Sequence, residues 1–138
     1  MNYTINIDHE DRIIHYKYPG LIERKDLGIA WKSILQIDEF VNKGYGLLSD
    51  YRNSKFNFTI NDTDEIWSFL IKNKELLKNK CEAILTDNPE NTVITILFEM
   101  EIYEKIGFEI KTFSTEPVAL DWLKKKVEFI RRQHYRGE

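Results

Sequence analysis

The change in apolar periodicity along the chain constrains its fold more than any other feature. Near the N-terminus Tyr3, Ile5 and Ile7 alternate with polar residues, as on a half-buried strand, and residues 12–18 give a second strand pattern. The polar stretch between them is short, so we expect an antiparallel hairpin. From about residue 24 onward, helical and strand patterns alternate to the C-terminus. The predicted order of elements is therefore ββαβαβαβα.

The later elements follow from periodicity and from helix start and stop signals. One segment, residues 92–97, is rich in β-branched residues, but Val93, Ile96, Leu97 and Met100 follow helical spacing, so we predict a helix there. The predicted helices cover about residues 24–37, 62–77, 89–106 and 115–130; the predicted strands after the hairpin cover residues 46–50, 81–86 and 108–113.

Strands joined by helices run parallel, whereas the first pair is antiparallel. The sequence therefore predicts the α/β class, with a mixed sheet, an antiparallel first hairpin and helices mainly on one face. We expect a single domain over residues 1–130 and a basic C-terminal tail over residues 131–138.

Composition narrows the functions that this fold can serve. A net charge of −3 gives no general attraction to nucleic acid, so no nucleic-acid partner is expected. No run approaches the roughly 20 apolar residues of a membrane span, and the N-terminus lacks a signal-peptide pattern. One cysteine, Cys81, excludes an internal disulfide and fits a reducing compartment. We expect a cytoplasmic protein, either monomer or homodimer.

Asp50 and Arg52 follow the strand predicted over residues 46–50, at the edge where parallel strands of an α/β sheet end. In one interpretation Arg52 binds anionic groups of a ligand or partner and Asp50 orients it. In the structural interpretation Asp50 accepts loop N–H bonds and Arg52 pairs with a nearby acid such as Asp62 or Asp64. We favour the structural interpretation, because structural ion pairs also collect at such positions.

The polar loop that follows contains Phe56 and Phe58 at alternating positions. They form either a hydrophobic lip or partner patch, or a short strand that covers the sheet edge or a helix. The sequence leaves these two interpretations open. Asp62, with Glu65 three residues on, is predicted to cap the next helix.

Asp87, Asn88 and Pro89 follow the next parallel strand and are expected beside Asp50. Two carboxylates there could hold a divalent cation, but capping of the following helix by Asn88 is the simpler role. No spacing of His, Cys and carboxylates indicates a zinc site, and no Ser or Cys has an evident base partner. We therefore predict no metal, no cofactor and no catalytic residue.

The chain resembles the SpoIIAA-like branch of the STAS domains, whose founding members are bacterial anti-sigma factor antagonists. The resemblance covers nearly the whole chain. The residues that carry it are the hairpin end Tyr18-Pro19-Gly20, Asp50 and Arg52 after the third strand, and the closing Phe113, Ala119, Trp122 and Leu123.

The resemblance implies a non-enzymatic interaction or regulatory module. Classical members switch partner binding by phosphorylation of an Asp-Ser-Ser/Thr-Gly motif, but this chain has Asp50-Tyr51-Arg52-Asn53-Ser54-Lys55 in that region, so the switch is not expected here. The predicted binding surface consists of Asp50, Arg52, Phe56, Phe58 and Asp62.

A small apolar, lipid-like ligand is the alternative to a protein partner. It is suggested by the lipid-binding Sec14-type folds, which are related to this family, and by an aromatic content of 13 %. Trp31, Trp67 and Trp122 are the residues that we expect to line such a cavity.

Overall fold

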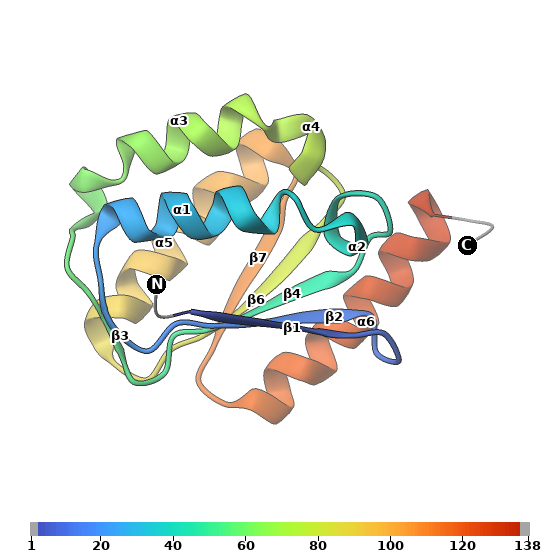
Figure 1. Cartoon of the computed structure of the whole chain (residues 1–138), viewed down its shortest axis with the longest axis horizontal. Coiled ribbons are helices and arrows are strands. Elements are labelled where there is room, and N and C mark those ends of the chain that lie inside the picture. Colours follow the sequence, from blue (N-terminus) through green and yellow to red (C-terminus); the bar gives the residue numbers. More distant parts are fainter. Residues whose placement is uncertain (1–2, 136–138) are drawn as a thin grey trace.

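A mixed five-stranded sheet forms the centre of the structure, a computed structural model that describes residues 3–135 (Figure 1). The first two strands pair antiparallel and all later neighbours pair parallel, which confirms the predicted mixed sheet. In spatial order the strands are β1 (Thr4–Asp8), β2 (Ile13–Lys17), β4 (Gly46–Asp50), β6 (Cys81–Leu85) and β7 (Glu109–Phe113).

A separate two-stranded parallel sheet lies beyond the ends of the main strands. It pairs β3 (Gly20–Ile22) with β5 (Ser54–Phe56), and Gly20 opens β3 with a φ of +90°, which favours glycine. Of the two interpretations of the loop aromatics, the short strand is therefore correct for Phe56. The strand β3 was not predicted, because three residues carry too little periodicity.

Five helices cover one face of the sheet and a single helix covers the other (Figure 1). This arrangement confirms the prediction that helices lie mainly on one face. The first group is α1 (Arg24–Ile34), α2 (Asp38–Val41), α3 (Asp64–Lys72), α4 (Lys74–Leu77) and α5 (Pro89–Ile106), and the opposite face carries α6 (Glu116–His134).

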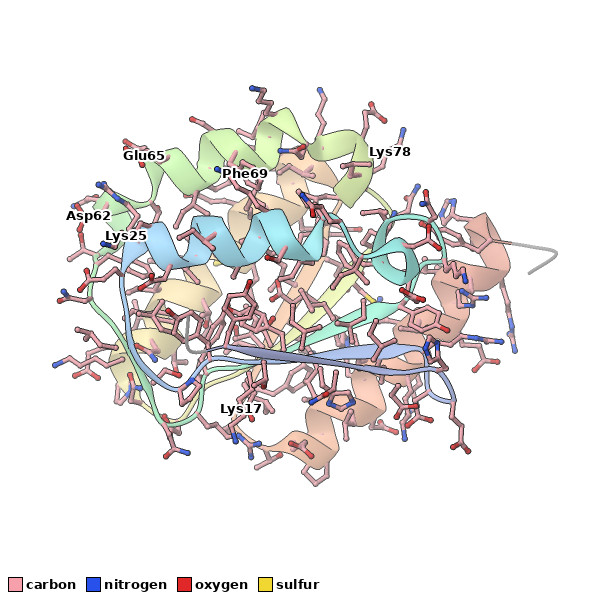
Figure 2. All side chains as sticks on the ribbon, viewed as in Figure 1. Lys17, Lys25, Asp62, Glu65, Phe69 and Lys78 are labelled. Carbon is pink, nitrogen blue, oxygen red and sulfur yellow. The ribbon has the colours of Figure 1, made fainter. Side chains whose placement is uncertain are left out.

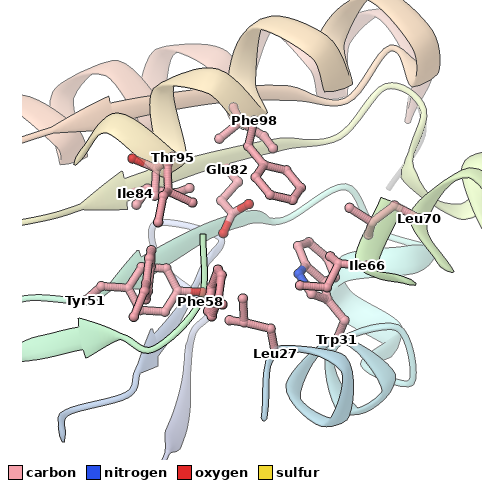
Figure 3. A pocket seen from close by; sticks show the side chains of 13 residues that line it. Leu27, Trp31, Tyr51, Phe58, Ile66, Leu70, Glu82, Ile84, Thr95 and Phe98 are labelled. Carbon is pink, nitrogen blue, oxygen red and sulfur yellow. The ribbon is translucent and has the colours of Figure 1, made fainter. Parts of the chain in front are cut away.

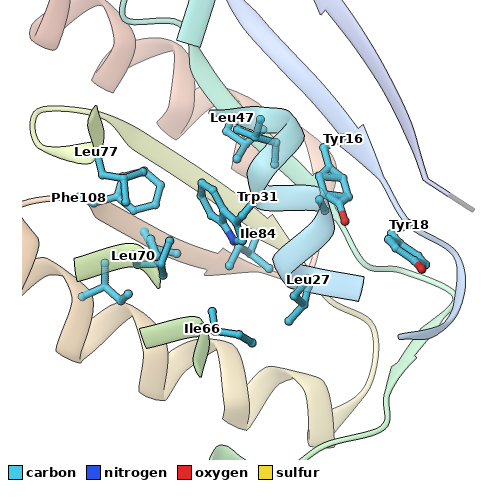
Figure 4. Close-up of a cluster of buried hydrophobic side chains, with 14 of the residues drawn as sticks. Tyr16, Tyr18, Leu27, Trp31, Leu47, Ile66, Leu70, Leu77, Ile84 and Phe108 are labelled. Atoms are coloured by element: carbon cyan, nitrogen blue, oxygen red, sulfur yellow. The ribbon is translucent and has the colours of Figure 1, made fainter. Parts of the chain in front are cut away.

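The central strands β4 and β6 lie between helices on both faces, and every one of their residues is buried. Toward α1 and α3, Leu47 and Ile84 join a large aromatic-rich cluster that includes Trp31 (Figure 4). Toward α6, Leu48 and Ala83 belong to a second cluster. Side chains of these two strands therefore have little contact with bulk water on either side.

Two predicted helices are interrupted. The helix predicted over residues 24–37 ends at Ile34, and α2 follows so that Phe40 enters the core. The helix predicted over residues 62–77 is split at Asn73, whose side-chain amide donates to the carbonyl of Phe69. A short polar side chain that bonds locally to backbone in this way competes with helix continuation.

The predicted role of Asp62 as the cap of α3 is wrong. Asp62 closes a 3₁₀ turn (Ile60–Asp62) by accepting bonds from the backbone N–H and hydroxyl of Thr59, at 3.0 and 3.1 Å. Its carboxylate is thus used one turn earlier, and α3 begins at Asp64 after Thr63.

The ends of α5 are as predicted: Asn88 accepts a bond from the N–H of Asn91, and Gly107 terminates the helix with a φ of +78°. Its apolar stripe, however, faces solvent. Val93, Ile96 and Met100 are exposed, as are Leu97 and Tyr103.

The helix α6 extends through His134, beyond the predicted domain end at residue 130. Arg131 donates to the backbone carbonyl of Lys43, and the Tyr135 ring lies against Gly44. Residues 131–134 are thus helical rather than part of a tail, and residues 136–138 of the predicted tail lie outside the described residues. Within residues 3–135, none of the helices has both the length and the apolar character that a membrane crossing requires.

The close approach of α6 to β4 gives a test of the packing. A Cβ added at Gly46 would lie 2.6 Å from Val127 and 2.9 Å from Leu123. We expect Gly46→Ala to lower the free energy of unfolding by about 1–3 kcal/mol through overpacking. Urea denaturation measures the change.

The matched control is Gly28→Ala in α1, where an added Cβ meets no atom within 4 Å. Alanine has the higher helix propensity, so this variant should be more stable by up to about 1 kcal/mol. Equal effects of the two substitutions would contradict the described packing of α6.

Candidate functional site

Asp50 and Arg52 form an ion-paired cluster with Glu116 at the first turn of α6. Arg52 donates from Nε and Nη2 to the two carboxylate oxygens of Asp50, at 3.0 and 2.9 Å, and Nη2 also donates to Glu116 at 2.9 Å. Asp50 further accepts the backbone N–H of Arg52 at 3.0 Å. Asp50 thus accepts a loop N–H, as the structural interpretation has it, and also orients Arg52, as the functional one has it; the acids that pair with Arg52 are Asp50 and Glu116 rather than Asp62 or Asp64.

Burial alone would raise the pKa of Asp50, but the hydrogen bonds from Arg52 outweigh it and hold the pKa below its ordinary value. Arg52 remains about one-third exposed and borders a groove of about 230 Å³ that also contains His15 and Lys17. Both charges of the pair are satisfied internally, so the cluster offers no unpaired cation to an anionic ligand.

Asp87 and Asn88 organise the loop beside this cluster. Asp87 accepts the backbone N–H of Asn53 at 2.9 Å, and Asn88 caps α5 as predicted. Within residues 3–135, no group of three or more His, Cys, Asp or Glu side chains is placed to hold a metal ion.

Phe56 and Phe58 point inward, against the same core as Trp31, and are at most 9 % exposed. Their loop is fixed from α5: Asn91 accepts the N–H of Phe56 at 3.1 Å and donates to the carbonyl of Ser54 at 3.1 Å. The two rings stack with centroids 5.1 Å apart. They therefore form a wall of the interior rather than an exposed patch.

Asp62 lies apart from the other predicted site residues except Phe58. Asp62 borders a polar surface groove beside Lys25 and Glu65 at the N-terminal ends of α1 and α3 (Figure 2), and Phe58 lines the same groove. The structure thus divides the predicted surface into the ion-paired cluster, the interior aromatic wall and this groove, and Phe58 borders the last two.

Behind Phe56 and Phe58 lies a partly open cavity of about 50 Å³, between the sheet and helices α1, α3 and α5 (Figure 3). Its walls are almost entirely apolar and aromatic. Trp31 lines it, Trp67 stacks on the lining residue Phe98, and Trp122 packs on the opposite side of the sheet. Among the lining residues are Leu27, Trp31, Tyr51, Phe56, Phe58, Ile66, Ile94, Thr95 and Phe98.

One carboxyl group, that of Glu82 on β6, points into this cavity (Figure 3). Glu82 is 3 % exposed, and Ser49 of β4 donates to its Oε2 at 2.5 Å. Burial raises the pKa of Glu82 from 4.5 to about 7, although the bond from Ser49 acts in the opposite direction. The carboxyl group is therefore poised to change its charge near neutral pH.

Two tyrosines accompany Glu82: Tyr16 of β2, and Tyr51, which directly follows β4. The rings of Tyr16 and Tyr51 meet edge to face, 5.9 Å apart. Burial and the nearby Glu82 charge raise the pKa of both phenols, so they stay protonated at neutral pH. The Tyr16 hydroxyl is buried and has no hydrogen-bond partner among the described residues.

Sequence reasoning did not find Glu82, although a signal was present. In the short strand Cys81–Leu85, period-two alternation places Glu82 on the same side as Ile84, the side that faces the helices. A charged residue at an inward position of a strand that is apolar on both faces is unusual, because charged side chains are rarely fully buried. An inward charged residue in an apolar strand therefore identifies Glu82 as a candidate functional residue from sequence alone.

The comparisons with known proteins support the fold. An uncharacterised DUF3478-family protein with a SpoIIAA-like fold, from Shewanella loihica PV-4, matches with a TM-score of 0.57 and 16 % identity over 88 % of this chain and 94 % of that chain. No protein-family model and no curated protein matches this chain. The chain therefore has a SpoIIAA-like fold, as its sequence resemblance implied; at this identity the likeness extends to the fold alone.

Titration of Glu82 should make stability depend on pH. The folded protein holds the Glu82 proton more tightly than the unfolded chain, so stability falls as pH rises from about 4.5 and levels off above about 7. The difference between the two pKa values corresponds to a loss of about 3 kcal/mol in the free energy of unfolding. We expect Glu82→Gln, which keeps a partner for Ser49, to gain stability over wild type progressively between pH 5 and pH 8.

Urea denaturation at several pH values measures this gain. Glu101→Gln on the exposed surface of α5 is the control and should follow the wild-type curve. An advantage of Glu82→Gln that stays constant with pH would show that Glu82 does not titrate in this range.

Proposed function

We propose that this chain is a non-enzymatic binding domain that holds a small apolar ligand between its sheet and helices α1, α3 and α5. One observation carries the proposal: the partly open apolar cavity contains a single, buried carboxyl group with a pKa raised to about 7. An apolar pocket with a few convergent polar groups and a perturbed pKa is the usual form of a ligand site.

The size of the cavity limits the ligand. A volume of about 50 Å³ is well below the several hundred Å³ of most ligand pockets, so it accommodates a few non-hydrogen atoms. A short compound, or one end of a longer one that leaves through the open side, fits better than a whole lipid. The fixed aromatic wall of Phe56 and Phe58 gives this site a preformed shape.

Two neighbouring isoleucines of α5 allow a matched test with 1-hexanol as the probe. Ile94 lines the cavity, whereas Ile96 is exposed on the opposite side of the helix. Ile94→Phe should fill the cavity and weaken 1-hexanol binding by about tenfold or more, as followed by amide chemical shifts. Ile96→Phe should leave the affinity unchanged.

Absence of 1-hexanol binding to the wild-type protein at millimolar concentration would count against a ligand site in this cavity. Equal affinities of the two variants would place the binding elsewhere on the protein.

A second function, a protein-interaction module, is favoured by the exposed stripe of α5. Met100 is 66 % exposed and Tyr103 58 %, and they continue the row formed by Val93, Ile96 and Leu97. A helix that is apolar on its outer face as well as its inner face typically has its outer face buried against another protein surface. Glu101 and Glu104 border the stripe, so the partner that fits is an apolar segment flanked by basic residues.

Amphipathic helical peptides with identical leucine faces and either lysine or glutamate flanks test this second function. The lysine peptide should bind more tightly by fluorescence anisotropy, and Met100→Asp should weaken it by about tenfold. No preference between the peptides, or an unchanged affinity of the variant, would argue against this use of α5.

A further inference from the structure

The carboxyl group of Glu82 has one satisfied oxygen and one free oxygen. Ser49 donates to Oε2, and no donor to Oε1 is found among residues 3–135. Within that range the only side-chain nitrogen or oxygen that is both buried from solvent and unpartnered is the Tyr16 hydroxyl oxygen, so Oε1 keeps a small exposure toward the partly open cavity. The carboxyl points into the space between Tyr51, Phe98 and Trp31 (Figure 3). The cavity thus contains a hydrogen-bond acceptor that the protein itself leaves without a donor.

Among residues 3–135, no positively charged side chain lines the cavity to compensate the Glu82 charge. The titratable groups that face Glu82 are the phenols of Tyr16 and Tyr51, which are neutral when protonated. The side chains turned toward it by α1, α3, α5 and β7 are apolar, apart from the uncharged Thr95. A buried carboxylate without a cation is costly, so it is normally paired.

The walls around this acceptor suit a cation. Aromatic rings from α1, β5, α5 and the loops on either side of β5 surround the cavity: Trp31, Phe56, Phe98, Tyr51 and Phe58. The faces of such rings attract ammonium groups, and their apolar bodies contact a hydrocarbon chain. An alcohol would offer one donor and no charge, and a carboxylic acid would bring a second negative group against Glu82.

We propose that the ligand of this cavity is an organic amine, whose ammonium group donates to the free oxygen of Glu82 while its first carbons contact the aromatic walls. This inference rests on the proposed function, since it names the chemical class of the apolar ligand. The cavity of about 50 Å³ holds the ammonium head and the adjoining carbons, and the remainder of the chain leaves through the open side.

Three probes with the same alkyl chain test the inference: hexylamine, 1-hexanol and hexanoate, each titrated into the whole protein at about pH 8 and followed by amide chemical shifts. Hexylamine should bind about tenfold more tightly than 1-hexanol, and hexanoate least tightly. Glu82→Gln should remove the preference for the amine, so that hexylamine and 1-hexanol bind this variant with similar affinities. Glu101→Gln is the control and should behave as wild type.

The pH dependence gives a second measurement that needs no variant. Hexylamine stays protonated below pH 8, whereas Glu82 takes up a proton as the pH falls through about 7. Hexylamine affinity should therefore fall by about tenfold between pH 8 and pH 6, and 1-hexanol affinity should not. A folding failure of Glu82→Gln would leave this measurement intact.

The outcomes separate the inference from the proposed function. Equal binding of hexylamine and 1-hexanol, or an amine preference that persists in Glu82→Gln, overturns the amine inference and leaves the apolar site standing. Failure of all three probes to bind overturns both.

Discussion

The two-sided burial of β4 and β6 is the constraint on which the rest of the structure depends. Every residue of these strands is buried, between α6 on one side and the other helices on the other. A polar side chain on either strand must therefore find its partner inside the protein. Asp50 pairs at the strand end with Arg52, which also donates to Glu116, and Ser49 pairs with Glu82 in the middle of the sheet.

These two polar pairs differ in a way that bears on function. At the strand end the charges of Asp50 and Arg52 neutralise each other. Arg52 also pairs with Glu116, so the pair connects the end of β4 to the first turn of α6. In the interior the Ser49–Glu82 pair leaves a negative group only half satisfied beside an open space. An incompletely satisfied buried carboxyl destabilises the fold, and ligand binding is the compensation that we propose.

Much of the fold was predictable because its signals are local. The strand Gly46–Asp50, the Asn88 cap with Pro89 and the Gly107 stop each depend on neighbouring residues. The candidate site was less predictable, because Ser49 and Glu82 are 33 residues apart and meet through the strand register. The outward stripe of α5 was ambiguous because that helix is apolar on both faces, so periodicity could not show which face is inward.

The most direct test of this account is the titration of the Glu82 side-chain carboxyl carbon by ¹³C NMR in the ligand-free protein. The signal is assigned by its absence from the Glu82→Gln spectrum. We predict a midpoint at about pH 7, because the carboxyl lies in an apolar cavity without a cation. A midpoint near the ordinary value of 4.5 would show that Glu82 is solvated or paired, and would contradict the central claim.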